Sequence, residues 1–180
     1  MQPDLMTMAK GLSSGYAPIG AVAVSDKVWE IFKEQKDKSL AHLLTFGGQA
    51  VATAAALKNI EILQRENLPQ QSAEKGAYLL ERLNTLREHP TVGDVRGLGL
   101  MCGVELVKNN QTKERWGKGS EYLKTVDRLL NSKGMVTRVW DVIHMAPPLV
   151  VTTEEIDRMV TMIDESLTEA EAQFKDEIGN

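Results

Sequence analysis

The hydrophobic residues of the first 34 positions form two short runs and one helical stripe. Apolar runs at residues 5–9 and 21–24 flank a loop that is rich in glycine and serine. This pattern indicates two short buried strands, the second covered on both faces. Ser25 then precedes a segment, ending at about residue 34, whose apolar side chains lie three and four positions apart. We therefore expect a capped helix there.

Two longer helices are predicted next. The segment 49–66 is rich in alanine, which suits a buried helix that packs closely against its neighbours. A second helix follows Pro69 and extends to about residue 88. Its leucines recur at helical spacing and should face a core: Leu79, Leu80, Leu83 and Leu86.

The pattern becomes richer in strands after residue 88. Helices are expected at 122–132 and after Thr152 or Thr153, where a threonine precedes acidic residues and an apolar stripe. The order of elements predicts an α/β fold followed by a small α+β unit. We expect a domain boundary between residues 1–88 and residues 89–180. Strands are predicted at 92–96, 99–107, 135–139 and 142–145.

Composition narrows the functional classes. The 180 residues are 42% hydrophobic and 26% charged with a net charge of −4, typical of soluble proteins and unlike nucleic-acid-binding domains. No apolar stretch is long enough to span a membrane, and no signal peptide is recognisable, so we expect a cytoplasmic protein. One cysteine and three scattered histidines do not suggest a metal site.

Lys10 is the first candidate for chemistry. It ends the first apolar run and is followed by Gly11 and a loop rich in glycine and serine. A lysine held at such a place can be desolvated, which disfavours the ammonium and frees the amine to attack a carbonyl. Schiff-base formation of this kind most often serves to hold pyridoxal 5′-phosphate (PLP). The alternative, from these residues alone, is an ordinary surface lysine.

The turn from Thr45 to Gly48, which includes Phe46, precedes the alanine-rich helix. Free backbone amides and the positive end of the helix dipole make such a place suitable for an anion, and a threonine hydroxyl can bind phosphate. The alternative is that Thr45 only caps the helix.

Arg138 is a charged residue in a strand pattern that is otherwise apolar. An inward-facing arginine needs a partner, and a substrate carboxylate could pair with it through two hydrogen bonds. The alternative is an ion pair within the chain, with Asp94 or Glu105 as the partner. The glycine-rich run at 96–103 does not match the dinucleotide-binding fingerprint, so we expect a strand there.

Four segments, taken in order, resemble the class III (subgroup II) PLP-dependent aminotransferases of fold type I. They are PDLMTMAKGLSSGYAPIGAVAVSDKV, HLLTFGGQAVATAAALKNIEI, VGDVRGLGLMCGVELV and VTRVWDVIHMAPPLVVTTEEID. The similarity runs across nearly all 180 residues.

The resemblance implies a function and a set of site residues. It implies transfer of an amino group from an amine or ω-amino acid to a keto acid such as pyruvate. Lys10 matches the family's Schiff-base lysine, and Thr45, with Phe46 beside it, matches the threonine that binds the cofactor phosphate across a homodimer interface. Arg138 would hold the acceptor carboxylate. Residues 1–88 would be the end of the large PLP-binding domain, and residues 89–180 the small C-terminal domain.

The sequence also departs from the family pattern. Gln49–Ala50 replaces the usual His-Pro, and the loop after Arg138 is shortened. Family members are more than twice as long, so we expect an N-terminally truncated chain without the aspartate that pairs with the cofactor's ring nitrogen. Alternatives are a catalytically inactive fragment, or an aminomutase or decarboxylase of the same family. We also expect exposed apolar surface and a tendency to aggregate.

Overall fold

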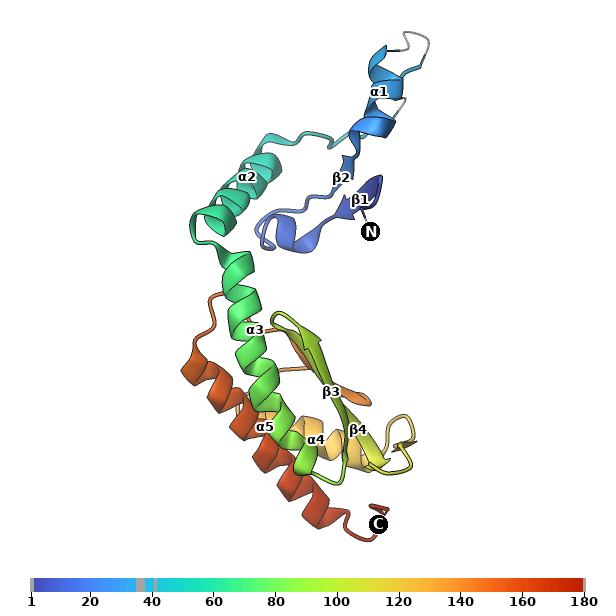
Figure 1. Cartoon of the computed structure of the whole chain (residues 1–180), viewed down its shortest axis with the longest axis vertical. Coiled ribbons are helices and arrows are strands. Elements are labelled where there is room, and N and C mark those ends of the chain that lie inside the picture. Colours follow the sequence, from blue (N-terminus) through green and yellow to red (C-terminus); the bar gives the residue numbers. More distant parts are fainter. Residues whose placement is uncertain (1, 35–37, 41, 180) are drawn as a thin grey trace. The chain divides into compact units, whose positions relative to one another are not determined.

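The computed structural model describes residues 2–34, 38–40 and 42–179. The chain divides into two compact units, Met1–Asn67 and Leu68–Asn180, which are described separately (Figure 1). Residues 68–88 therefore belong to the C-terminal unit, whereas the sequence pattern places the boundary between residues 88 and 89. The reason is tertiary: the helix over these residues packs on the sheet and on the last helix of the C-terminal unit.

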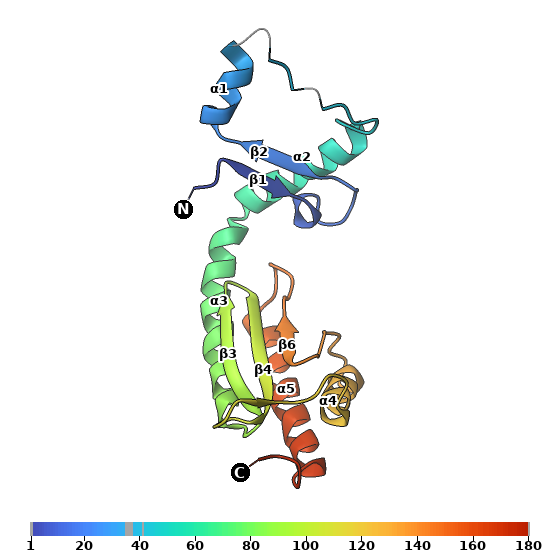
Figure 2. The ribbon, with the colours of Figure 1, turned by 90° about the vertical axis from the view of Figure 1, so that its right-hand side faces the viewer.

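The N-terminal unit contains an antiparallel two-stranded ribbon, in which Leu5 pairs with Val24 and Met8 pairs with Ala21. A short 3₁₀ turn follows the first strand and contacts the longer helix of the unit (Figure 2). The alanine-rich helix begins after Gln49, whose side chain caps it. The elements are β1 (Leu5–Met8), η1 (Lys10–Leu12), β2 (Ala21–Val24), α1 (Asp26–Glu34) and α2 (Ala50–Arg65).

Burial in the N-terminal unit differs from the prediction. Every residue of β1 and β2 is exposed, although both runs were expected to be buried strands. In α2, only Ala52 and Ala56 are buried. A two-stranded ribbon supplies no second layer of its own, so its apolar side chains stay exposed in the described part of this unit.

The C-terminal unit is a small antiparallel sheet with helices packed against it. β4 is central: it pairs with β3, and then with β6 and β5 along successive stretches. The elements are α3 (Leu68–Asn84), η2 (Thr85–Glu88), β3 (Val92–Leu98), β4 (Met101–Asn109), β5 (Glu114–Arg115), α4 (Glu121–Ser132), β6 (Val142–Met145) and α5 (Thr153–Gln173). The predicted strand at 135–139 is wrong: this segment forms only a single bridge, between Val139 and Ile143.

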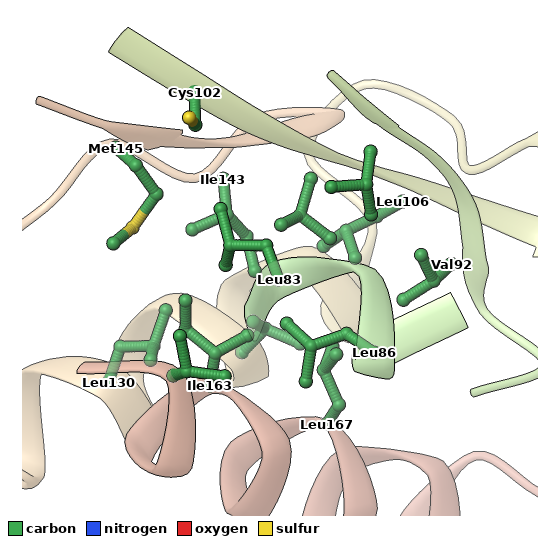
Figure 3. Close-up of a cluster of buried hydrophobic side chains, with 14 of the residues drawn as sticks. Leu83, Leu86, Val92, Cys102, Leu106, Leu130, Ile143, Met145, Ile163 and Leu167 are labelled. Atoms are coloured by element: carbon green, nitrogen blue, oxygen red, sulfur yellow. The ribbon is translucent and has the colours of Figure 1, made fainter. Parts of the chain in front are cut away.

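A cluster of buried hydrophobic side chains forms the core of this unit. Leu83 of α3 and Leu86 of η2 face Ile163 and Leu167 of α5, with Ile143 of β6 nearby (Figure 3). All five side chains are fully buried, as the leucine spacing predicts for α3. Alternate residues of β4 also point into this core: Cys102, Val104 and Leu106.

The start of α5 confirms the predicted cap. Thr152 accepts a hydrogen bond from the backbone N–H of Glu155, and the Glu155 side chain accepts one from the backbone N–H of Thr152. Among the helices that the structure describes, none combines the length and hydropathy of a membrane span.

Candidate functional site

Lys10 occupies a tight turn directly after β1. Its backbone adopts a left-handed conformation (φ 50°), which is uncommon for a residue with a side chain. The turn is closed by a hydrogen bond from the N–H of Leu12 to the carbonyl of Ala9 (3.1 Å). Ser13 is buried, and its hydroxyl donates to the carbonyl of Ala17 (2.6 Å). These bonds give the segment a defined backbone.

A side chain of α2 fixes the same turn from outside. Asn59 donates from Nδ2 to the carbonyl oxygens of Gly11 (2.8 Å) and Leu12 (3.1 Å). One amide group therefore bridges two carbonyls that follow Lys10. Asn59 could not be predicted from the sequence, because no local sequence pattern indicates a side-chain hydrogen bond between positions so far apart in the chain.

The amine of Lys10 is unpaired in the described part of the chain. It makes no hydrogen bond or ion pair with the residues that the structure describes, whereas Lys27 pairs with Asp4 and Lys58 pairs with Glu61. Lys10 is exposed, so the desolvated position expected from the sequence is not present in this unit. What the structure does supply is a fixed backbone carrying an unpaired amine.

The turn before α2 is built by glycines. The N–H of Gly47 donates to the carbonyl of Leu44 (3.0 Å), and a Cβ at Gly47 would lie 3.1 Å from that oxygen. Gly48 has a φ of +69°, which favours glycine. Thr45 and Phe46 stand exposed on this turn.

Thr45 does not cap the helix. The cap is Gln49, whose Oε1 accepts a hydrogen bond from the N–H of Ala52 (2.7 Å). The capping role considered for Thr45 is therefore wrong, and its hydroxyl has no partner within residues 2–34, 38–40 and 42–179. A free hydroxyl beside the N-terminus of a sixteen-residue helix is suited to an anionic group.

Lys10 and Thr45 are attached to different parts of α2. The Lys10 turn is held by Asn59, ten residues beyond the capping Gln49. At about 1.5 Å of rise per residue, the two attachment points are about 15 Å apart along the helix. The two turns that carry these candidate residues therefore meet α2 at separate points.

Arg138 is exposed and lies outside any strand, so the inward-facing position predicted for it is wrong. It sits immediately before the tight hairpin bridge between Val139 and Ile143. Its guanidinium carbon lies 4.8 Å from the centre of the Trp140 ring, a cation–π distance. The backbone N–H of His144 donates to the carbonyl of Arg138 (3.2 Å).

Asp94 and Glu105 are not partners of Arg138. Both belong to a chain of alternating charges across the exposed face of the sheet. The Arg87 hydrogen bond, aided by Arg96, holds the pKa of Asp94 below its usual value. The chain of charges runs Arg87, Asp94, Arg96, Glu105, Arg115 and Asp141. Arg138 has no carboxylate partner in the described part of the chain, so the proposed internal ion pair is wrong.

Comparison with known proteins assigns the family. The sequence profile described as aminotransferase class-III matches residues 1–167. This chain belongs to the class-III aminotransferases. Members of the family depend on PLP. The family assignment confirms the resemblance seen in the four sequence segments.

Relatives of this chain are named after several different substrates. An adenosylmethionine-8-amino-7-oxononanoate aminotransferase from Anoxybacillus flavithermus is 40% identical over 174 residues, covering 94% of this chain and 38% of that protein. A putrescine–pyruvate aminotransferase from Pseudomonas aeruginosa is 36% identical, covering 94% of this chain and 37% of that protein. This chain therefore spans well under half the length of these relatives.

Solved structures show the same fold. An (S)-enantioselective ω-transaminase from Thermomicrobium roseum matches with a TM-score of 0.86 and 38% identity, over 94% of this chain and 38% of that chain. A transaminase from the marine bacterium Virgibacillus matches with a TM-score of 0.88 and 36% identity, over 97% of this chain and 41% of that chain. The α/β fold expected for the C-terminal part of a fold type I transaminase is confirmed.

Proposed function

We propose that this chain carries the cofactor-binding lysine and the carboxylate-binding arginine of a PLP-dependent transaminase. The reaction would transfer an amino group from an amine or ω-amino acid to a keto acid such as pyruvate. The observation that carries the proposal is the Lys10 turn, whose backbone is fixed on α2 while its amine stays unpaired among the described residues.

The residues present fit two parts of PLP. The amine of Lys10 suits the aldehyde group, and the hydroxyl of Thr45 with the amides of its turn suits the phosphate. We place Phe46 beside the phosphate on the same turn. When bound, the cofactor supplies an electron-withdrawing ring that lets the substrate's amino-bearing carbon lose a proton. The Nζ of Lys10 would take that proton as a general base.

The distance between the two turns supports a homodimer as part of the proposal. The Lys10 turn and the Thr45 turn join α2 about 15 Å apart, at a rise of about 1.5 Å per residue. We propose that Thr45 and Phe46 bind the phosphate of the cofactor held by Lys10 of a second copy.

The proposed role of Arg138 is to hold the carboxylate of the keto acid. Its guanidinium is exposed and has no acidic partner in the described residues, so its planar N–H groups can form a bidentate pair. Relatives named putrescine–pyruvate and taurine–pyruvate aminotransferases support an amine donor with a keto acid acceptor. The relative named diaminobutyrate–2-oxoglutarate transaminase shows that acceptors vary among the similar proteins.

The proposal is tested by titrating the 180-residue chain with PLP and recording the visible absorbance. We expect a band that Lys10→Ala abolishes and that Lys27→Ala, a change at another exposed lysine of the same unit, leaves intact. A folded chain with no Lys10-dependent band would contradict the proposal and favour the inactive-fragment alternative. Where the band forms, alanine produced from pyruvate distinguishes transamination from the aminomutase and decarboxylase alternatives.

A further inference from the structure

Trp140 is an exposed aromatic residue in contact with Arg138. Its side chain is 62% exposed, so it does not belong to the hydrophobic core. The guanidinium of Arg138 lies over its ring at 4.8 Å. The ring of His144 also meets Trp140 edge to face, with the ring centres 6.2 Å apart. Trp140 thus contacts two exposed side chains, Arg138 and His144.

The backbone beneath this cluster is fixed. His144 contacts the carbonyl of Arg138 twice, through its backbone N–H (3.2 Å) and through Nδ1 (3.1 Å). The hydroxyl of Thr137 donates to the carbonyl of His144. The N–H of Trp140 donates to the carbonyl of Val142 (3.4 Å), which closes the hairpin. The backbone of Arg138 is therefore held in place. Only the rotatable bonds of its side chain remain free to change conformation.

Arg138 lies on the wall between two cavities of the C-terminal unit. It lines a cavity of about 870 Å³ together with His144 and another of about 830 Å³ together with Trp140. Trp140 lines only the second. Arg138 and the Trp140 ring that it contacts therefore share the second cavity.

Stacking leaves the hydrogen-bonding capacity of the arginine intact. A guanidinium that lies over an aromatic ring uses one flat face, while its N–H groups point outward in its own plane. A carboxylate binds in that plane through two parallel hydrogen bonds. An arginine already held in place loses less conformational freedom when the carboxylate arrives.

We propose that Trp140 is a positioning residue that preorganises Arg138 for a substrate carboxylate. This inference rests on the carboxylate role proposed above for Arg138. It adds that the affinity for the keto acid depends on an aromatic face two residues further along the hairpin, at the point where the loop is shorter than the family pattern.

The stacking itself is tested by NMR of the arginine side chains in the full 180-residue chain. The Nε–Hε resonance of Arg138 is assigned by its loss in Arg138→Lys. We expect a ring-current shift at this resonance that disappears in Trp140→Leu and is retained in Trp140→Phe. Trp29→Leu is the matched control, because Trp29 is also exposed but lies on α1 in the other unit. A resonance unchanged in Trp140→Leu would overturn the inference.

The positioning role is tested by titrating the same resonance with pyruvate, with methyl pyruvate as the control that lacks a carboxylate. We expect the dissociation constant for pyruvate to rise about twofold to fivefold in Trp140→Leu, as an exposed cation–π contact predicts. Trp140→Phe and Trp29→Leu should bind pyruvate nearly as the unmodified chain does.

The outcomes separate the two proposals. Equal or tighter pyruvate binding in Trp140→Leu would overturn the positioning role and leave the carboxylate role of Arg138 standing. No binding of pyruvate by the unmodified chain would overturn both. Because the measurement needs no PLP, a failure of Lys10 to bind the cofactor does not affect it.

Discussion

The two units of this chain differ most in what covers their strands. In the C-terminal unit, β4 alternates between buried and more accessible residues, and helices cover its apolar side. In the N-terminal unit, every residue of β1 and β2 is exposed. The candidate reactive lysine nevertheless lies in the N-terminal unit, whose order depends on local turns and on Asn59 rather than on a core.

This difference shows that a turn with a defined backbone does not require a local hydrophobic core. The Lys10 turn is held by hydrogen bonds, each of which contributes about 0.5–1.5 kcal/mol. The C-terminal unit is held by fully buried side chains, which contribute more per residue. We therefore expect substitutions in the C-terminal unit to act on global stability and substitutions around Lys10 to act locally.

The largest expected effect comes from Leu83→Ala. Leu83 is fully buried between α3 and α5, so its truncation should lower the free energy of unfolding by about 2–5 kcal/mol. Leu57→Ala is the matched change in the N-terminal unit, where Leu57 is 69% exposed, and should stay within about 0.5 kcal/mol. Urea unfolding followed by circular dichroism measures both. Equal effects would contradict the contrast between the units.

Gly76→Ala should also destabilise the C-terminal unit. A Cβ at Gly76 would lie 2.2 Å from the backbone of Gly99, so the loop after β3 would have to move away from α3. We expect a loss of about 1–3 kcal/mol from overpacking, even though alanine favours helix. Gly11→Ala is the comparison in the N-terminal unit, because a Cβ there meets nothing within 4 Å. Thermal unfolding that is unchanged by Gly76→Ala would count against the close packing of α3.

His89 makes the stability of the C-terminal unit depend on pH. Its ring nitrogens lie 3.0 Å from Glu171 and 2.9 Å from Asp164. The hydrogen bond to Glu171 raises the pKa of His89 most; burial opposes it and Asp164 adds to it. Since the folded-state pKa is raised, the stabilisation is fully present below the unfolded value of about 6.5 and is lost as the pH rises through the folded value.

The variant His89→Gln isolates this contribution. We expect it to cost about 1.5 kcal/mol at pH 5.5, the lower end of the range for hydrogen bonds to charged groups, and clearly less at pH 9. Urea unfolding at both pH values gives the comparison. A cost that grows with pH would show that the sign of this linkage is wrong.

The smallest expected effect on stability is that of Asn59→Ala. It removes the two bonds to the carbonyls of Gly11 and Leu12, and we expect a local cost of about 1 kcal/mol. Hydrogen exchange measured by mass spectrometry should speed up in the segment 11–14 and not in β4. Asn84→Ala, which removes a bond to Leu80 in the C-terminal unit, is the control. Unchanged exchange at 11–14 would mean that Asn59 does not hold the turn.

The sequence predicts well those features that depend on local periodicity. Leu79 and Leu83 of α3 and Leu86 of η2 recur at helical spacing and are fully buried, and the Thr152–Glu155 box caps α5 as expected. These features can be predicted because a helix depends on side chains that lie within one or two helical turns of each other in the sequence.

Features that depend on distant contacts could not be predicted in this way. The exposure of β1 and β2 depends on which layers pack over them, and the apolar runs alone are equally typical of buried strands. The boundary at 67/68 depends on α3 packing against β3 and α5. The partner of Arg138 depends on a hairpin that folds Trp140 back beneath it, and a charged residue in an apolar pattern gives no sign of that turn.

The central claim is that the reactive amine of this chain is Lys10, on a turn of the N-terminal unit. The most direct test is to add PLP to the 180-residue chain, reduce with borohydride and locate the modified residue by peptide mass spectrometry. We expect the label on Lys10 above the other lysines, with Lys27→Ala labelled equally and Asn59→Ala labelled less. Label spread evenly over exposed lysines, or an unchanged label in Lys10→Ala, would contradict the account.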